Sequence, residues 1–394
     1  MMNSGLKKHV DKLLFALAIT VLATALFHFG TAKTSAGAKT TNIVFTQWWD
    51  NYLEKDTLNE LVSEFEKTRP GIKIEQNPVS YEKLHGELFN KNDSPVRGDI
   101  IALDPLWVPE LQKMEIIDFP DGQNLKAPIL SFINVFYYNI GILREAGFSR
   151  PPKSRGELIN YARALSSAEK GPRALAWGRN CSRGIYDDVL PWLWAGGAEL
   201  TKDGKPVFNS RPVIDSLSFL ASLVREGFIV PDGAVLDSEK KLEDFISGKA
   251  AFMISSTKDI EYVRKKMGDD AFGITSIPVP DNYSGKTCHA SAGWTLGINA
   301  RSANKEAARL FADFIAGKAA LLSEKARVIP GNNRPDPFYS KVWDITIAGE
   351  NAQDLAGLPW GKLAEIFNEE LSSLFAGQHS AAETAAAIQK RWEK

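Results

Sequence analysis

Tryptophan and carboxylate side chains at the ends of expected strands are the residues of this sequence best suited to bind a ligand. Trp48 and Trp49 stand side by side directly after the apolar stretch NIVFTQ, and Asp50 follows them. Aromatic faces fit the apolar C–H patches of sugar rings, while carboxylates at the same rim accept hydrogen bonds from hydroxyl groups. The alternative is that the two indoles only fill a corner of the core. Either role fits the pair taken alone.

The other tryptophans favour a ligand cleft. The chain has ten, and seven of them lie at or near expected strand ends or in loops, where burial within a helix does not account for them. Core filling explains any single one equally well, but seven at element ends are typical of an aromatic-lined cleft. The seven are Trp48, Trp49, Trp107, Trp177, Trp192, Trp194 and Trp294.

No catalytic motif or metal-binding pattern stands out. The P-loop, G-x-G-x-x-G after a strand, G-x-S-x-G and H-E-x-x-H are all absent. The five histidines never fall at ligand spacing, which argues against a metal ion. A glycosidase needs only two carboxylates on opposite sides of a sugar, and carboxylates are plentiful here, including paired aspartates at 187–188 and 269–270. Such pairs, however, are most often solvated turns or caps. We therefore expect neither cofactor nor metal.

Length and charge exclude several classes of protein. The 394 residues are 44% hydrophobic and 24% charged, an ordinary globular composition that is long enough for about two domains. Basic and acidic residues number 47 and 48, which gives a formal net charge of −1. Because this balance lacks the positive surface that a phosphate backbone demands, nucleic acid is not expected as a partner.

Residues 1–38 are typical of an export signal. Lysines precede the uncharged run LLFALAITVLATALFHF, and a small-residue stretch with an A-x-A-like cleavage pattern follows it. An uncleaved membrane anchor is the alternative. Either way, the rest of the chain is expected outside the cytoplasmic membrane. The only cysteines, Cys181 and Cys288, either form one disulfide or remain buried thiols.

Strands and amphipathic helices alternate along the rest of the chain. Leucine, valine and phenylalanine residues at helical spacing within 58–65 separate a strand at 42–49 from another at 72–79, which predicts a β-α-β unit. Such alternation is typical of a mainly parallel sheet covered by helices. Further strands are expected at 98–105, 250–255, 272–280 and 291–300, and further helices at 81–90, 107–117, 150–167, 213–227, 238–249, 303–317, 360–377 and 380–394.

The order of these segments resembles the carbohydrate-type family of extracellular solute-binding proteins of ABC importers, which includes maltose-binding protein. The likeness covers nearly the whole chain after the signal. Five segments carry it in the family's order: FYYNIGILREAGFSRPPKSRGELINYARAL, WLWAGGAELTKDGKPVFNS, FISGKAAFMIS, SAGWTLGINARSANKEAARLFADFIAG and VIPGNNRP. The resemblance implies an α/β, two-lobed periplasmic-binding-protein fold (type II-like), with two sheets flanked by helices around a hinged cleft. It implies lobe I at 41–135 and 281–325, and lobe II at 136–280 and 326–394.

That likeness also implies where the ligand binds. Trp48 and Trp49 lie at the carboxyl end of the first strand, where ligands bind in open α/β sheets, so one indole is expected to face the cleft and the other to pack beneath it. An aspartate at the place of Asp104 accepts hydrogen bonds from hydroxyl groups in this family, although a helix cap is the alternative. The candidate ligand-binding residues are Trp48, Trp49, Asp50, Asp104, Trp107, Asn134, Tyr186, Asp187, Trp192, Ser256, Trp294, Asn332 and Arg334.

The function implied by the resemblance is that of a non-enzymatic, monomeric receptor, periplasmic or tethered to the outer face of the cytoplasmic membrane. It would capture a sugar or small oligosaccharide and deliver it to the transmembrane subunits of an ABC permease by hinge closure. Glycerol 3-phosphate or a glycerophosphodiester is the alternative solute, for which Arg183 and Arg334 would suit the phosphate. An exported carbohydrate-active enzyme and a sensory module are alternatives of other classes.

Overall fold

The computed structural model describes residues 40–90, 96–119, 128–166, 173–179, 183–230, 238–326, 336–352, 355 and 358–394. The chain divides into two units, Met1–Thr41 and Asn42–Lys394, and the elements below belong to the second. Four sequence predictions lie outside the described residues: the export signal, the pairing of Cys181, and the ligand contacts of Asn332 and Arg334.

Nine of the described strands join in one hydrogen-bonded sheet, which confirms the α/β class. Its order is β2-β1-β3-β12-β5-β9-β6, with β10 beside β5 and β4 beside β12. Pairing is parallel between β1 and β3 and between β6 and β9, and antiparallel along β5 and β12. The strands are β1 (Thr41–Gln47), β2 (Ile72–Pro78), β3 (Ile100–Leu103), β4 (Ile117–Asp118), β5 (Leu130–Asn139), β6 (Arg173–Ala176), β9 (Ala250–Ser256), β10 (Phe272–Thr275) and β12 (Ser291–Asn299).

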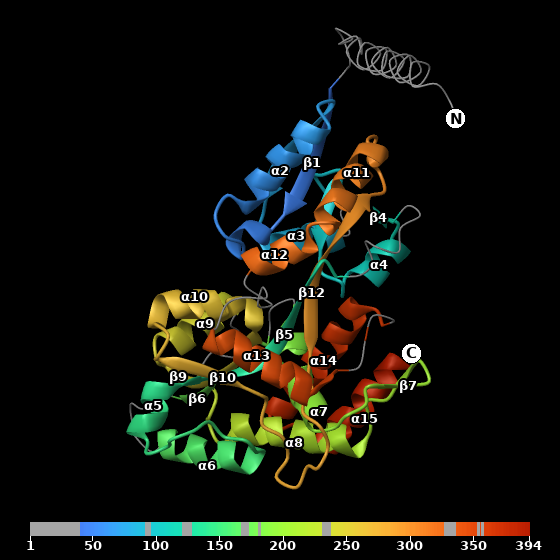
Figure 1. Ribbon diagram of the computed structural model, residues 1–394. Coiled ribbons are helices and arrows are strands. Elements are labelled where there is room, and N and C mark those ends of the chain that lie inside the picture. The colour runs from blue at the N-terminus through green and yellow to red at the C-terminus, as the bar shows by residue number, and fades with distance from the viewer. Residues whose placement is uncertain are drawn as a thin grey trace, which may run out of the picture. The chain divides into compact units, whose positions relative to one another are not determined.

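The two long strands β5 and β12 connect the halves of this sheet. Leu130 to Ile133 of β5 pair with β12, whereas Asn134 to Tyr138 pair with β9. In turn, β12 continues from β5 to β3. The two sheets expected from the sequence are therefore continuous through β5 and β12, which run between the two groups of elements in Figure 1.

Helices flank both halves of the sheet (Figure 1). Beside β1, β3 and β12 lie α2 (Thr57–Thr68), α3 (Tyr81–Phe89), α4 (Val108–Lys113), α11 (Lys305–Ala316) and α12 (Ala319–Lys325). The other half carries α5 (Ile140–Glu145), α6 (Arg155–Ser166), α7 (Leu190–Ala195), α8 (Arg211–Arg225), α9 (Ser238–Ile246), α10 (Ile260–Met267), α13 (Pro337–Ala348), α14 (Trp360–Phe375) and α15 (Ala381–Trp392).

Short elements complete the described chain. The one-turn segments η1 (Trp49–Asn51) and η4 (Thr257–Asp259) follow β1 and β9 directly, and the π-helical η3 (Ile185–Val189) leads into α7. Two small two-stranded pairs stand apart from the main sheet: the antiparallel pair of β7 (Thr201–Lys202) with β8 (Lys205–Pro206), and the parallel pair of β11 (Cys288–His289) with β13 (Glu350–Asn351).

Amphipathic spacing accounts for the packing of the helices. In α2, Leu58, Leu61 and Phe65 are buried on one face, and the Phe65 ring lies 5.1 Å from that of Phe311 in α11. Because both helices present apolar faces to the same half of the sheet, they bury them against each other and the strands. Within the described ranges, no helix is both long and apolar enough to span a bilayer.

One predicted helix is shorter than its sequence pattern suggests. The apolar residues of 107–117 predict a single helix, but α4 ends at Lys113 and strand β4 begins at Ile117. Glu115 adopts a left-handed backbone conformation with φ of 56°, which an α-helix cannot accommodate. The chain therefore turns at Glu115 and returns Ile117 to the sheet beside β12.

Candidate ligand-binding site

A cavity of about 440 Å³ lies where several strands end. Such a volume is within the roughly 300 to 1,000 Å³ typical of small-molecule pockets. Residues from both halves of the sheet line it: Trp48, Tyr52, Ser80, Tyr81, Glu82, Asp104, Phe132, Gly293 and Trp294 on one side, and Arg183, Asp187, Glu239, Lys241, Leu242, Ser255, Ser256, Lys258 and Asp259 on the other.

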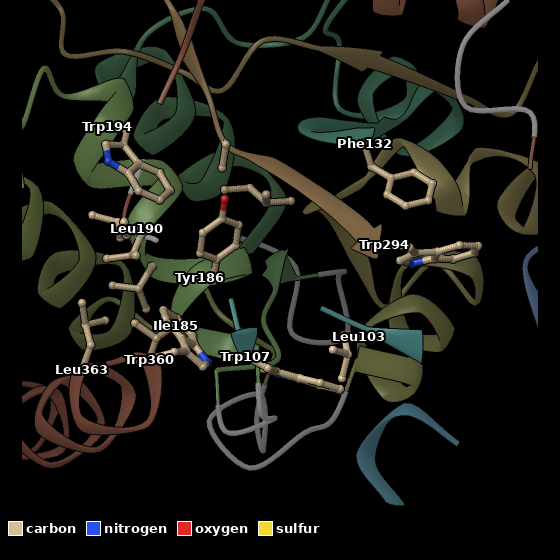
Figure 2. Packing of buried hydrophobic residues seen from close by; sticks show 14 of the residues in the cluster. Leu103, Trp107, Phe132, Ile185, Tyr186, Leu190, Trp194, Trp294, Trp360 and Leu363 are labelled. Atoms are coloured by element: carbon tan, nitrogen blue, oxygen red, sulfur yellow. The ribbon is translucent and has the colours of Figure 1, made fainter. Parts of the chain in front are cut away.

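Trp48 and Trp294 give the cavity an aromatic wall. Trp294 stacks on the fully buried Trp49, with ring centroids 5.2 Å apart and planes at 11°. Phe132 lies against Trp294 at 5.1 Å, and Figure 2 shows these two rings side by side. Trp48 meets Tyr81 edge-on at 5.1 Å. Of the two adjacent tryptophans, Trp48 thus lines the cavity and Trp49 lies behind Trp294.

The turn after β1 explains how adjacent tryptophans come to face different ways. The Gln47 side-chain oxygen accepts hydrogen bonds from the backbone N–H groups of Trp49 and Asp50, at 2.5 and 3.2 Å. The Gln47 amide nitrogen donates to the Asp50 carboxylate at 2.8 Å. Because Gln47 is completely buried, these bonds fix the short helical turn η1 and hold Asp50 at the turn, outside the cavity lining.

A line of charged and polar groups crosses the cavity. Arg183 pairs with Asp104, and its Nε lies 3.1 Å from Asp187 Oδ2. The Tyr81 hydroxyl donates to Asp104 Oδ2 at 2.8 Å, and the amide of Asn134 donates to Asp187 Oδ1 at 3.0 Å. Asp104 directly follows β3 and also accepts a hydrogen bond from the backbone N–H of Leu106, so it partly serves as the local cap considered from the sequence.

Burial and neighbouring charges shift the pKa values of Arg183, Asp187 and Tyr81. Burial acts to lower the pKa of Arg183, but Asp104 and Asp187 raise it well above its usual value. Burial likewise acts to raise the pKa of Asp187, yet the charge and hydrogen bonds of Arg183 bring it below the ordinary value. Burial and then Asp104 raise the pKa of Tyr81 well above the usual range. Tyr81 therefore keeps its proton and remains a donor.

A second set of ion pairs lies at the end of β9. Lys258 Nζ is 2.9 Å from Asp259 Oδ1 and 4.2 Å from the centre of the Tyr52 ring. Ser255 donates to the other oxygen of Asp259 at 2.7 Å. Nearby, Lys241 Nζ lies 3.0 Å from both oxygens of Asp188. Burial raises the pKa of Asp188 to about 6 against the opposing charge of Lys241, so this carboxylate is mostly ionised at neutral pH.

Six of the residues singled out from the sequence line the cavity: Trp48, Asp104, Asp187, Ser256 and Trp294, and Arg183, which was suggested for a phosphate solute. Asn134 is buried just behind them and touches the site through Asp187. Trp107 is completely buried against Trp48 and Tyr81, at 5.5 and 4.7 Å. Trp107 therefore supports the aromatic wall from behind.

Two other candidates differ from the sequence expectation. Trp192 is completely buried between Phe136 and Phe219, outside the cavity lining, because every residue of α7 is buried and the helix is part of the core. Tyr186 is packed between Trp194 and Trp360, as Figure 2 shows, at 5.5 and 5.8 Å. The Tyr186 hydroxyl donates to the backbone carbonyl of Ser291, which ties η3 to β12.

Several lining residues were not singled out from the sequence. Lys258 and Asp259 follow β9 immediately, so the rule that ligands bind beyond the carboxyl ends of strands would have found them. Tyr81 opens α3 after the N-cap Ser80, and no local pattern marks it. Within the described ranges, no three His, Cys, Asp or Glu side chains gather closely enough to hold a metal ion.

Comparisons with known proteins agree on one family and one fold. Residues 50–321 match the profile of the family described as bacterial extracellular solute-binding protein. A probable ABC transporter-binding protein of Deinococcus radiodurans is 22% identical over 276 residues, which are 64% of this chain and 64% of that protein, less than two thirds of its length.

Solved structures match nearly the whole chain. The structure described as maltose-bound T. maritima MalE3 has a TM-score of 0.71 and 19% identity, covering 90% of this chain and 99% of that one. UgpB from Mycobacterium tuberculosis, in complex with glycerophosphocholine, has a TM-score of 0.71 and 17% identity, covering 90% and 98%. At these identities the matches establish the two-lobed fold.

Proposed function

We propose, since the chain belongs to the bacterial extracellular solute-binding protein family, that it captures a sugar or small oligosaccharide and delivers it to the transmembrane subunits of an ABC permease. The observation that carries this proposal is the cavity with an aromatic wall on one side and carboxylates around it. Maltose-bound MalE3 and the probable ABC transporter-binding protein of Deinococcus radiodurans support the same assignment.

Binding in this proposal combines stacking with hydrogen bonding. A sugar ring lies over Trp294 or Trp48, where its C–H face replaces water on the indole. Asp104 and Asp187 accept hydrogen bonds from its hydroxyl groups, since each carboxylate offers about four lone pairs and is only partly used by its protein partners. Both indoles are almost fully buried, so the solute enters as the halves of the cavity move apart.

Hinge closure then completes the binding site. The strands β5 and β12 run between the two halves of the sheet, and a rotation about them opens or closes the cavity. We propose lobe I at 41–135 and 281–325 and lobe II at 136–280 and 326–394. The closed, solute-bound form is the one that docks on the permease, as a monomer.

In this proposal the protein is exported and non-enzymatic, and it needs no cofactor. It is either periplasmic or tethered to the membrane by its amino-terminal apolar run. A glycosidase needs one carboxyl group with a raised pKa as acid and a second carboxylate across the sugar. Here Arg183 pairs with both Asp104 and Asp187, and the pKa of Asp187 is lowered. Asp187 is therefore not suited to donate a proton at neutral pH.

A glycerophosphodiester is the second candidate solute. The likeness to UgpB, whose structure contains glycerophosphocholine, and the position of Arg183 in the cavity favour it. An arginine is a suitable phosphate ligand when its guanidinium is available for bidentate hydrogen bonds.

Calorimetric titration tests the proposed function. The purified protein is titrated with maltose, trehalose, glucose, glycerol 3-phosphate and glycerophosphocholine, and each mixture is then analysed for breakdown products. Saturable binding without breakdown, weakened by Trp49→Ala beneath the wall, supports a receptor. The proposal is contradicted if a glycoside is consumed, or if none of the sugars binds saturably.

A further inference from the structure

The described lining of the cavity carries more acidic than basic side chains. Five carboxylates stand against three cations, a formal difference of two negative charges. The acidic residues are Glu82, Asp104, Asp187, Glu239 and Asp259, and the basic residues are Arg183, Lys241 and Lys258. Glu82 and Glu239 are exposed, but the carboxylates in ion pairs, Asp104, Asp187, Asp188 and Asp259, are largely buried and outnumber the three cations by one. These buried charges act on a bound solute with less screening than charges at an open surface.

Each of the three cations is already held by a carboxylate. Arg183 pairs with Asp104 and, at 3.1 Å, with Asp187. Lys258 lies 2.9 Å from Asp259, and Lys241 lies 3.0 Å from Asp188. A phosphate that approached any of them would have to displace a carboxylate from a buried ion pair while facing the remaining negative charges.

The aromatic side of the cavity accommodates a cation. The ammonium group of Lys258 lies 4.2 Å from the centre of the Tyr52 ring, a cation–π distance, with the Asp259 carboxylate beside it. Trp48 and Trp294 belong to the same lining. Thus the cavity joins aromatic side chains to an excess of carboxylates, an arrangement that stabilises an amino group.

We propose that this cavity selects its solute by charge: it binds an amino-bearing polyol more tightly than the neutral polyol and excludes a phosphate ester. The inference rests on the proposed receptor function and narrows it, since it decides against the glycerophosphate class. Arg183, held between Asp104 and Asp187, orients these two carboxylates and is not an anion receptor.

A matched set of solutes tests this order of binding affinities. Glucosamine, glucose and glucose 6-phosphate are titrated calorimetrically at pH 6.5, together with the three corresponding galactose compounds, at low and high ionic strength. We expect the amine to bind about tenfold more tightly than the neutral sugar and the phosphate at least about tenfold more weakly, with both gaps shrinking as salt screens the charges. A phosphate ester that binds as tightly as the amine overturns the inference.

A second experiment uses inorganic phosphate and does not depend on the identity of the sugar. The wild-type protein is expected to show no saturable binding of phosphate, whereas Asp104→Asn combined with Asp187→Asn frees the Arg183 guanidinium and creates phosphate binding. Asp215→Asn, an exposed carboxylate on α8 outside the cavity, is the control and is expected to behave as wild type.

The outcomes separate the two proposals. Saturable phosphate binding by the wild type that Arg183→Met abolishes overturns charge selection, and so does a folded double variant that still fails to bind phosphate. If the double variant does not fold, the wild-type titration and the solute series still decide. Failure of every sugar and amino sugar to bind overturns the proposed capture of a sugar.

Discussion

The Arg183 guanidinium pairs with the Asp104 carboxylate across 79 positions of the sequence. Asp104 directly follows β3 in one half of the sheet, while Arg183 precedes η3 in the other half. The side chains of Arg183 and Asp104 are only 13% and 4% exposed. This buried pair therefore joins the two sides of the cavity in this structure and positions the Asp104 carboxylate.

Removal of Arg183 is expected to destabilise the protein strongly. Arg183→Met leaves Asp104 and Asp187 without their shared cation, and loss of one partner of a buried pair costs about 3–5 kcal/mol in the free energy of unfolding. Urea unfolding at pH 7 measures this loss. The same change at Arg211, whose pair with Asp215 is exposed, is expected to cost under about 1 kcal/mol.

A combined variant separates charge from packing. Arg183→Met together with Asp104→Asn and Asp187→Asn removes the uncompensated charges, so part of the lost stability should return. If the triple variant is no more stable than Arg183→Met alone, the loss arises from packing of the arginine side chain and the ion-pair explanation is wrong.

Tryptophans inside and outside the cavity lining are expected to differ in their effect on binding. Trp294→Ala and Trp192→Ala each remove a buried indole and should each lower the free energy of unfolding by about 3–5 kcal/mol. Only Trp294 lines the cavity, so only its loss should weaken solute binding, by about tenfold or more. Calorimetry of both folded variants with the same sugar measures the difference, and equal affinities would place the solute elsewhere.

Periodicity and turn residues predicted most of the fold. The apolar spacing of α2 and the alternation in β2 reflect burial on one face of each element, which is a local property of sequence. The end of α4 was missed because the left-handed conformation of Glu115 has no local signal in its residue type. Likewise, the continuity of the sheet depends on pairing between distant strands, β5 and β12.

The cavity was only partly predictable. Trp48 and Asp104 directly follow β1 and β3, so position alone led to them, whereas Trp294 lies inside β12 and was singled out by its residue type. Trp192 is the same residue type but lies in α7, a helix whose residues are all buried. Its burial depends on tertiary packing, which residue type does not reveal. The sequence suggested Arg183 as a phosphate ligand, but its pairing with Asp104, which is distant in sequence, has no signal in residue order.

Acid is expected to weaken the protein through Asp187. The charge and hydrogen bonds of Arg183 outweigh burial and lower the pKa of Asp187 in the folded protein below its ordinary value, so the unfolded chain binds more protons as pH falls through the acid range. The contribution of this group to stability is thus fully present well above pH 4 and declines as pH falls further. Asp187→Asn should flatten the fall in urea-unfolding free energy between about pH 5 and pH 3. An unchanged slope would show that other carboxylates cause the acid sensitivity.

The Tyr137 hydroxyl is expected to stabilise the end of β9 beside the cavity. It donates at 2.7 Å to the backbone carbonyl of Ser256, a lining residue, and its ring stacks on Phe272. Tyr137→Phe keeps the ring but leaves this buried hydrogen bond unmade, which should lower the free energy of unfolding by about 1 kcal/mol. Urea unfolding measures the loss, with solute binding followed in parallel.

A matched tyrosine shows whether that loss comes from the hydrogen bond. The Tyr161 hydroxyl donates at 3.3 Å to the carbonyl of the exposed Arg150, a longer and only partly buried bond, so Tyr161→Phe should change stability by less than about 0.5 kcal/mol. Since Ser256 borders the cavity and Arg150 does not, only Tyr137→Phe should also weaken solute binding. Equal losses of stability in both variants, or unchanged binding in Tyr137→Phe, would mean that β9 keeps Ser256 in place through its pairing with β5 alone.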